Sequence, residues 1–391
     1  MSSIVKTRFL IFVVFISPLG FAEEPVFQCE RAEDWNAFFD RAEGWLVGDG
    51  IFTFGIDGNS RQGSAGDTSQ TVFLFSDSFF GRANPDGTFQ PGLRMVNHCL
   101  AVLTGGKPDQ ENMTFFTGTD DRNRPTNLFD RKFWLGDGIV IDDRLYTTGF
   151  VADPKTLKLA DGPWLISIPV RDGQLVFSEF KTEWVKLFHR DGPSEVMFGI
   201  GICDDGDDIY VYGFRDKPEV RIFPRQLVVA QAPRRSFGDV STWRFWTGNA
   251  WSEDIADCNH DQAALARGMS NELSVTKMIG GRYDGKYVLV YTELCITDKL
   301  NFALADSPFG KFSAPTTFYR CPEPKEYEKE VKDDHGPQAF VVTYNAKAHP
   351  RLSQPGELLV SYNLNIFGMK EGLLFQNKKH AYPRFVLLKL L

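Results

Sequence analysis

The sequence lacks the spacings that mark common metal and nucleotide sites. None of its six cysteines forms a CxxC pair, so the ligand spacing of a structural zinc site is absent. Its glycine-rich segments do not have the spacing of a phosphate-binding loop, and the sequence shows no signature of a Ser-His-Asp catalytic triad. We therefore expect a protein that needs no cofactor and no catalytic metal.

Clusters of basic residues are absent too. The chain has 43 Lys and Arg against 51 Asp and Glu, which gives a formal net charge of -8. An acidic surface of this kind argues against nucleic acid or an anionic membrane as the partner. It suits a neutral or cationic ligand, and charge alone does not choose between the two.

Long hydrophobic runs are missing apart from one near the start of the chain. Residues 1–22 predict a secretory signal peptide, because Lys6 and Arg8 precede the apolar residues 9–16 and a small-x-small cleavage site ends at Ala22. The apolar part is shorter than the roughly 20 residues of a spanning helix. A retained membrane anchor is the alternative. We expect a secreted or periplasmic protein without membrane association after cleavage.

All six cysteines follow the predicted signal peptide. In an exported protein an even number of cysteines permits a disulfide framework. We expect one or two bridges, with Cys29 tying the N-terminal segment to the body of the protein. The alternative is that the cysteines are buried free thiols.

Helical periodicity is scarce, and residues 31–43 are one of the few stretches that predict a short helix, while residues 323–332 form a charged surface segment. The composition instead includes 35 phenylalanines, 35 glycines and 21 prolines. Short apolar runs are interrupted by Asp-Gly, Gly-Gly and Asn/Asp clusters, which is typical of many short strands joined by tight turns. The sequence therefore predicts an all-β protein.

The stretch from residue 44 to residue 81 shows the repeating pattern most clearly. Two apolar runs of strand length flank a polar connection. Asp49 lies between two glycines in the first run, and Asp77 lies between two serines in the second. Similar units of strand, turn and strand recur four more times, and the five units begin near residues 44, 133, 194, 271 and 338.

Five such units predict a five-bladed β-propeller with about four antiparallel strands per blade. Radial repetition leaves only short, protected sheet edges. Residues 384–391 are expected to supply the last strand and to pair with the N-terminal segment. We expect residues 23–43 to form that segment and residues 44–391 to form one domain. Two β-sandwich domains are the alternative.

The strands also resemble those of a known family. The resemblance covers roughly residues 44–391 and is carried by the runs LVVAQAP, WRFWTGNAW, YVLVYTE, DSPFGKF and ELLVSYN. These are similar to a secreted bacterial family of five-bladed propellers known only as a domain of unknown function. A closely similar group cleaves arabinan-type polysaccharides, and glycoside hydrolase families 43, 62, 32 and 68 share the architecture. The W-M-N-D-P-N-G signature of invertases and the sialidase Asp-box are missing, which disfavours those activities.

Acidic residues stand where the innermost strand of each unit is expected to begin. Because all these strand starts face one end of the axis of a propeller, we expect the side chains to converge there. They are Asp49, Asp137, Glu195 and Glu272, with Asp334 and His335 just before the fifth unit. The alternative is that each is a solvated turn residue, as we expect for Asp142, Asp143 and residues 204–208.

Hydrolysis of a glycosidic bond needs one protonated and one ionised carboxyl group. The resemblance implies that Asp49 is the base, that Asp137 orients or tunes the pair, and that Glu272 is the acid, with Glu195 as the alternative acid. We expect inversion at the anomeric carbon. Crowding of carboxylates raises the pKa of at least one of them and so supplies the acid.

Six further residues are candidates for contacts with a sugar, because aromatic faces suit sugar rings and polar groups suit their hydroxyls. Core packing or turn bonding is the alternative for each of them. They are Trp45, Trp134, Asp77, Asn271, His335 and His349.

These features predict a secreted glycoside hydrolase that acts, as a monomer, on a furanoside-type polysaccharide or oligosaccharide. The alternative is a non-catalytic carbohydrate-binding or surface propeller, in which the acidic funnel holds only water or a structural cation.

Overall fold

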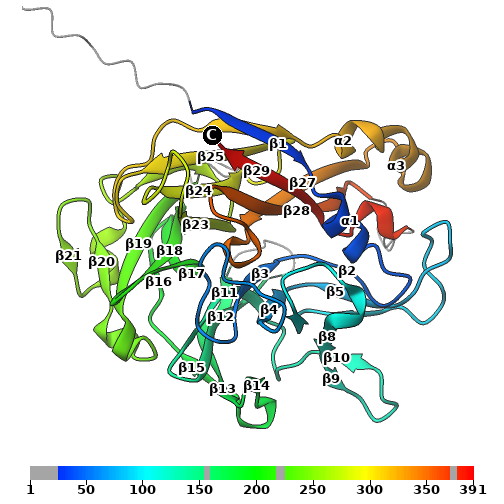
Figure 1. Cartoon of the computed structure of the whole chain (residues 1–391), viewed down its shortest axis with the longest axis horizontal. Helices are drawn as coiled ribbons and strands as arrows, with labels where there is room; N and C mark the ends of the chain where they lie inside the picture. Colours follow the sequence, from blue (N-terminus) through cyan, green and yellow to red (C-terminus); the bar gives the residue numbers. More distant parts are fainter. Residues whose placement is uncertain (1–24, 154–158, 217–224, 370–376) are drawn as a thin grey trace, which may run out of the picture.

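The computed structural model of the protein describes residues 25–153, 159–216, 225–369 and 377–391. The prediction of a mostly β structure is confirmed, with short helices between the strands. Figure 1 shows the sheets following one another around the molecule in chain order, from blue through green and yellow to red. The predicted signal peptide, residues 1–22, lies outside the described residues.

Within the described residues, five antiparallel sheets have four or more strands each. The first sheet has the order β3-β4-β7-β8, with β3 (Phe52–Gly55), β4 (Gln70–Phe75), β7 (Cys99–Thr104) and β8 (Met113–Phe116). The second contains β11 (Trp134–Ile141), β12 (Arg144–Ala152) and β13 (Leu159–Arg171), followed by β14 (Gln174–Leu175) and β15 (Lys181–Trp184), which both pair with β13.

The third sheet is the widest. It contains β16 (Phe188–Asp191), β17 (Ser194–Asp205), β18 (Asp208–Asp216), β19 (Arg225–Pro233), β20 (Arg244–Trp246) and β21 (Trp251–Ser252), with β22 (Ala266–Met269) also on β19. The fourth contains β23 (Leu273–Lys277), β24 (Tyr287–Thr292), β25 (Lys299–Ala305) and β26 (Thr316–Arg320). The fifth has the order β1-β29-β28-β27, with β1 (Phe27–Arg31), β29 (Arg384–Leu390), β28 (Glu357–Phe367) and β27 (Phe340–Ala348).

Two smaller sheets and short α-helices accompany these five sheets. One three-stranded sheet contains β2 (Glu43–Gly48), β5 (Ser78–Arg82) and β6 (Arg94–Val96), and β9 (Gly118–Thr119) pairs with β10 (Pro125–Thr126). The α-helices are α1 (Glu33–Phe39), α2 (Glu323–Glu326) and α3 (Glu328–His335). The prediction of a short helix within residues 31–43 is therefore confirmed. No helix among the residues described here is both long and apolar enough to cross a membrane.

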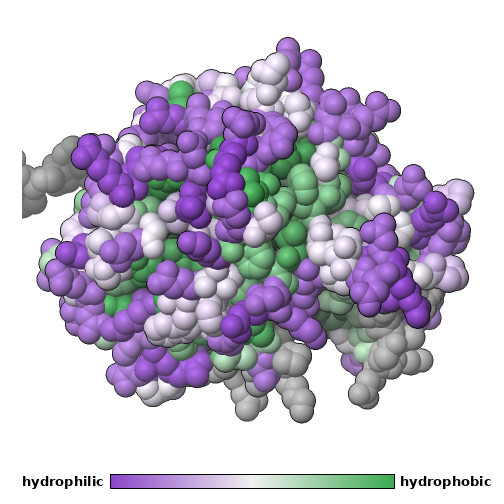
Figure 2. All heavy atoms as spheres, turned by 90° about the horizontal axis from the view of Figure 1, so that it is seen from below, coloured by the Kyte–Doolittle hydropathy of each residue, from purple (hydrophilic) through white to green (hydrophobic). Residues whose placement is uncertain are grey.

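The middle strands read as unbroken apolar runs because neighbouring sheets cover both of their faces. Every residue of β24 is buried, and β4 is buried except at its first residue. Continuous apolar runs of this length are expected for strands covered on both faces. Side chains that do reach the surface are mostly hydrophilic, as the face in Figure 2 shows, with hydrophobic residues visible between them.

One strand of each large sheet faces the centre of the molecule. β11 packs against β3 and β17, and β23 packs against β17 and β27. His349, just after β27, bonds through Nδ1 to the Thr53 hydroxyl of β3 at 2.9 Å, so the first and fifth sheets also meet. A cavity of about 40 Å³ lies between these strands and is lined by residues from all five of them.

The two ends of the chain close the fifth sheet together. β1 pairs antiparallel with β29, from Phe27 opposite Leu390 to Arg31 opposite Val386, and the two strands lie side by side in Figure 1. Helix α1 then packs its Phe39 ring on Phe385 of β29, with ring centroids 5.0 Å apart and planes within 9°. The predicted pairing of the last strand with the N-terminal segment is confirmed.

The prediction of disulfides is wrong. All six cysteines are free thiols, five of them buried and Cys29 partly so. Burial raises the pKa of the Cys29 thiol to about 12. The strand pairing of β1 with β29, and not a disulfide at Cys29, ties the N-terminal segment to the body.

Loss of the Phe39 ring should destabilise the closed fifth sheet. Phe39 is fully buried between Phe385 and Trp45, so we expect Phe39→Ala to lower the free energy of unfolding by about 3–5 kcal/mol. Phe340→Ala is the matched control, because Phe340 is 46% exposed and its loss should cost less than about 1 kcal/mol. Urea unfolding of both variants checks this, and equal midpoints would contradict it.

Candidate active site

Both apolar runs of the first unit break at an acidic residue. Asp49 separates β2 from β3, and Asp77 separates β4 from β5. The two breaks are tied together, because the Asp49 N–H donates to the Asp77 carbonyl at 3.2 Å and the Ser76 N–H donates to the Asp49 carbonyl at 2.8 Å. Gly50 has φ +62°, and a Cβ atom there would lie 2.6 Å from the Ser76 hydroxyl, so this turn requires glycine. The chain therefore places the two carboxyl groups side by side.

Asp77 is held by two side-chain donors. The Asn97 amide donates to its Oδ1 at 2.9 Å, and the Trp134 side chain also hydrogen-bonds to it. Burial raises the pKa of Asp77, and these two hydrogen bonds oppose the rise. Trp134 is half-buried at the start of β11, so the predicted aromatic residue does lie beside the carboxylates.

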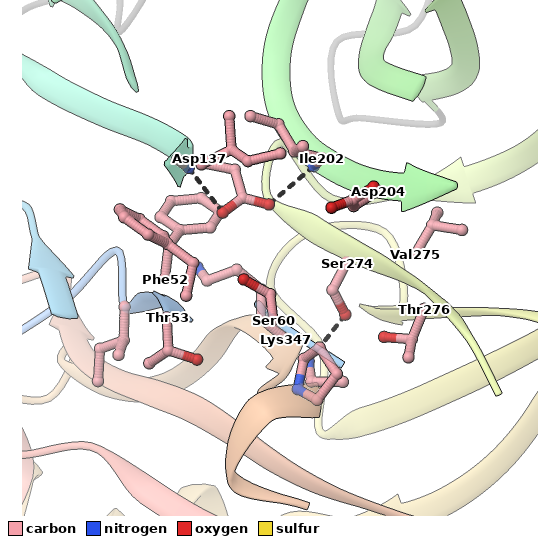
Figure 3. A pocket seen from close by; sticks show the side chains of 16 residues that line it. Phe52, Thr53, Ser60, Asp137, Ile202, Asp204, Ser274, Val275, Thr276 and Lys347 are labelled. Atoms are coloured by element: carbon pink, nitrogen blue, oxygen red, sulfur yellow. Dashed lines mark hydrogen bonds between the residues drawn. The ribbon is translucent and has the colours of Figure 1, made fainter. Parts of the chain in front are cut away.

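Both carboxylate oxygens of Asp137 are occupied by backbone donors, as Figure 3 shows. The Gly138 N–H donates to Oδ1 at 2.8 Å, and the Ile202 N–H of β17 donates to Oδ2 at 2.7 Å. Burial raises the pKa of Asp137 to about 7, although these bonds favour its ionised form. The carboxyl group is therefore fixed in orientation between the second and third sheets.

Asp49 accepts one hydrogen bond from a neutral group. The Tyr344 hydroxyl of β27 donates to its Oδ2 at 2.7 Å. Burial, and then the negative charges of Asp77 and Glu272, raise the pKa of Asp49 to about 8. Asp49 is thus an acid that can hold a proton at neutral pH.

Glu272 precedes β23 and forms an ion pair with the Lys347 ammonium of β27. The Lys347 side chain is only 1% exposed, and its Nζ lies 4.3 Å from the centre of the Phe52 ring. The positive charge of Lys347 also lowers the pKa of Asp49 and of Asp137. One buried cation therefore acts on three carboxyl groups.

The four carboxyl groups come from the first, second and fourth units and interact electrostatically. Asp77 and Glu272 raise the pKa of Asp49, and Glu272 also raises that of Asp137, which lines the central cavity. Each keeps part of its surface open to solvent, so a ligand can reach them. Figure 3 shows Asp137 and Lys347 in the cavity wall together with Phe52 and Ser274. Among the described residues, no His, Cys, Asp and Glu side chains are grouped so as to hold a metal ion. Chemically, the cluster offers both protonated and ionised carboxyl groups within one site.

Two of the predicted sugar-binding residues belong to the core instead. Trp45 is 1% exposed, stacks on Phe115 and donates its indole N–H to Ser78 at 3.2 Å. His349 is fully buried, and its two ring nitrogens bond to the hydroxyls of Thr53 and Ser361. Burial lowers the pKa of His349 to about 3, so this ring is neutral. Neither side chain can meet a sugar, and both expectations are wrong.

His335 and Glu195 do not join the carboxyl cluster either. His335 ends α3, where it is fully buried close to His380, so the expected contact with a sugar is wrong. Glu195 forms an ion pair with Arg190 at 2.8 Å near the start of β17. It precedes Ile202, the donor to Asp137, by seven residues, which corresponds to roughly 20 Å along a strand. The expected convergence of Glu195 with the other acids is therefore wrong.

Asn271 stands where expected, half-buried beside Glu272, and its side-chain oxygen accepts a contact from the Cys295 thiol at 3.7 Å. The residues that the sequence did not indicate are Lys347, Tyr344 and Asn97. Lys347 and Tyr344 flank a bulge in β27, where the pairing with β28 shifts between them. A lysine within an otherwise buried strand is the signal that could have been used.

Several solved structures are similar to this chain. A Bacteroides ovatus protein described as a "putative hydrolase" is 18% identical, with 92% of this chain and 90% of that chain covered and a TM-score of 0.66, so the two share a fold. A GH43_1 enzyme from Xanthomonas citri complexed with xylose is 12% identical over 91% of this chain and 92% of that chain, with a TM-score of 0.43. The α-L-arabinofuranosidase from Podospora anserina, in complex with cellotriose, is 12% identical over 89% and 96%, with a TM-score of 0.39.

No curated protein sequence matches the chain significantly. A family model described as a domain of unknown function, DUF5005, matches residues 32–389, which is nearly all of the described chain. The resemblance to a family known only as a domain of unknown function is thereby confirmed. On this match the protein belongs to the DUF5005 family.

Proposed function

We propose that this protein is a glycoside hydrolase that cleaves a furanoside-type, arabinan-like polysaccharide or oligosaccharide. The observation that carries the proposal is the electrostatic interaction of Asp49 with Asp77 and Glu272, and of Asp137 with Glu272, with the pKa of Asp49 and Asp137 raised to about 8 and about 7. Perturbed carboxyl groups that converge in one site are typical of acid–base catalysis.

The proposed fold is a five-bladed β-propeller, and the five large sheets are its blades. The row of inner strands from β3 to β27 and the completion of the fifth sheet by β1 support this arrangement. In such a fold the ends of the inner strands surround one funnel, which explains how residues more than two hundred positions apart meet. The proposed protein is exported, and residues 1–22 are its signal peptide.

Within this site the reacting pair is Asp49 and Glu272. Asp137 has both oxygens bound by backbone N–H groups, so it suits an orienting and tuning role better than direct proton transfer. Trp134, Asp77 and Asn271 lie next to the pair and would contact the sugar. The proposed reaction inverts the configuration at the anomeric carbon. In such a reaction one carboxyl group protonates the leaving oxygen while the other activates a water molecule.

Removal of either member of the pair should abolish turnover. We expect Asp49→Asn and Glu272→Gln each to lower kcat on linear arabinan by about 10²–10⁴-fold, the usual contribution of a general acid or base. Asp142→Asn is the matched control, because Asp142 is exposed in the turn between β11 and β12 with φ +48°. Reducing-end assays on arabinans and arabinoxylans measure this. A wild-type protein that binds these glycans without cleaving them would support the non-catalytic alternative.

Inversion has its own test. Proton NMR spectra recorded during hydrolysis should show the product anomer opposite to the substrate linkage first, before mutarotation mixes the two forms. First appearance of the same anomer would indicate a retaining reaction.

The raised pKa of Asp49 predicts a dependence of stability on pH. A carboxyl group whose pKa rises from 3.8 to about 8 on folding favours the folded state fully below the unfolded value, and this contribution is lost as the pH rises towards 8. Asn carries no charge at any pH. We therefore expect Asp49→Asn to melt at a higher temperature than the wild type at about pH 9, and the difference to shrink towards about pH 4. Calorimetry across this range, with Asp142→Asn as the control, measures it; a constant difference would contradict it.

A further inference from the structure

We propose that Lys347 is a positioning residue that keeps Glu272 ionised, so that Glu272 is the general base of the reaction and Asp49 is the general acid. This assignment rests on the proposed glycosidase function, and it reverses the roles that the resemblance implies for the two carboxyl groups. It follows from which charged and polar groups touch each of them.

The first step is the environment of Lys347. Its ammonium group is buried, with the side chain 1% exposed, so it needs an anionic partner to offset its desolvation. Glu272 supplies that partner in an ion pair, and the Phe52 ring covers the ammonium at 4.3 Å. Protonation of Glu272 would remove the one carboxylate that forms an ion pair with this buried cation. The ion pair therefore opposes the state that a general acid must occupy before the reaction.

The second step is the environment of Asp49. Its hydrogen-bond partner is the hydroxyl of Tyr344, which is neutral. Of the charged groups that act on it, the acids Asp77 and Glu272 have larger effects than the Lys347 cation. Tyr344 donates to Oδ2, which leaves Oδ1 to carry a proton. Like charges that share one site cannot all ionise easily. Asp49 is thus the member of the pair that holds a proton.

The other charged groups around the site have assigned partners. Asp77 accepts from Asn97 and Trp134, and both oxygens of Asp137 accept backbone N–H groups. Asp77 and Asp137 each accept two hydrogen bonds that stabilise the ionised form, whereas Asp49 accepts one, from Tyr344. The pKa values of Asp49 and Asp137, about 8 and about 7, agree with this order.

The proposed step balances with water as the second reactant. The Glu272 carboxylate takes one proton from the water molecule while the water oxygen bonds to the anomeric carbon. The bond from that carbon to the leaving oxygen breaks, and the Asp49 carboxyl group gives its proton to that oxygen. Glu272 ends protonated and Asp49 ionised, and exchange with solvent restores both.

The protonation states can be measured without any substrate. Infrared difference spectra of the full protein at neutral pH should contain a protonated-carboxyl band that weakens in Asp49→Asn and stays in Glu272→Gln. Lys347→Met should add a second such band, and Lys347→Met/Glu272→Gln should lack that added band. Lys347→Arg should resemble the wild type. Absence of a protonated band, or its loss in Glu272→Gln instead of Asp49→Asn, would overturn the proposal even if Lys347→Met does not fold.

Lys277→Met is the matched control for these spectra. Lys277 lies on strand β23 and pairs with Asp205, and both line the adjoining cavity of about 240 Å³ and not the central one. We expect it to leave the protonated-carboxyl bands unchanged. A new band of the same size in Lys277→Met would overturn the specific role of Lys347.

Turnover measurements on the same variants provide an independent test. On 4-nitrophenyl α-L-arabinofuranoside, whose leaving group needs no proton, Asp49→Asn should keep turnover within about tenfold of the wild type, while on linear arabinan it should lose about 10²–10⁴-fold. Glu272→Gln should lose activity on both. Lys347→Met should lower turnover on both substrates, because Glu272 loses the ammonium group that holds it in place, and Lys347→Arg should restore it. The reverse pattern for the two acids would overturn the assignment.

A wild type without glycosidase activity would instead refute the proposed function, and the infrared result would still decide the protonation states.

Discussion

A single buried ammonium group, that of Lys347, makes the crowding of acidic side chains at the centre of this protein tolerable. Four partly buried carboxyl groups that act on one another would repel strongly if all were ionised. One ion pair to Glu272 and one neutral donor to Asp49 divide the cluster into groups with different proton affinities. That difference is what an acid–base pair needs, and it arises from placement alone.

Two of the four carboxyl groups are placed by breaks between strands. β2 and β3 are one apolar run that is broken at Asp49, and β4 and β5 are another that is broken at Asp77. At each break the chain leaves one sheet and enters another, so the acidic residue lies between two strands and not within either. The flanking glycines permit the turn, and the two backbone hydrogen bonds between the breaks hold the carboxyl groups in register.

The strands and the positions of Asp49, Asp77, Asp137 and Glu272 could be predicted because alternation, turn residues and acidic strand starts are local signals. The residues that contact these acids could not be predicted from the sequence. Lys347 and Tyr344 reach the acids only because β27 contains a bulge, and a bulge is set by packing against β28. The predicted role of Trp45 failed for the opposite reason: an aromatic residue near an acid has the same sequence pattern whether it faces a ligand or the core.

The joining of β1 to β29 has a consequence for how the chain is made. Strand β1 can pair with its neighbour β29 only after almost the whole polypeptide exists, since the pairing brings Phe27 to Leu390. Contacts of such separation close late and slowly. The fifth sheet therefore stays incomplete until the C-terminal strand has been synthesised.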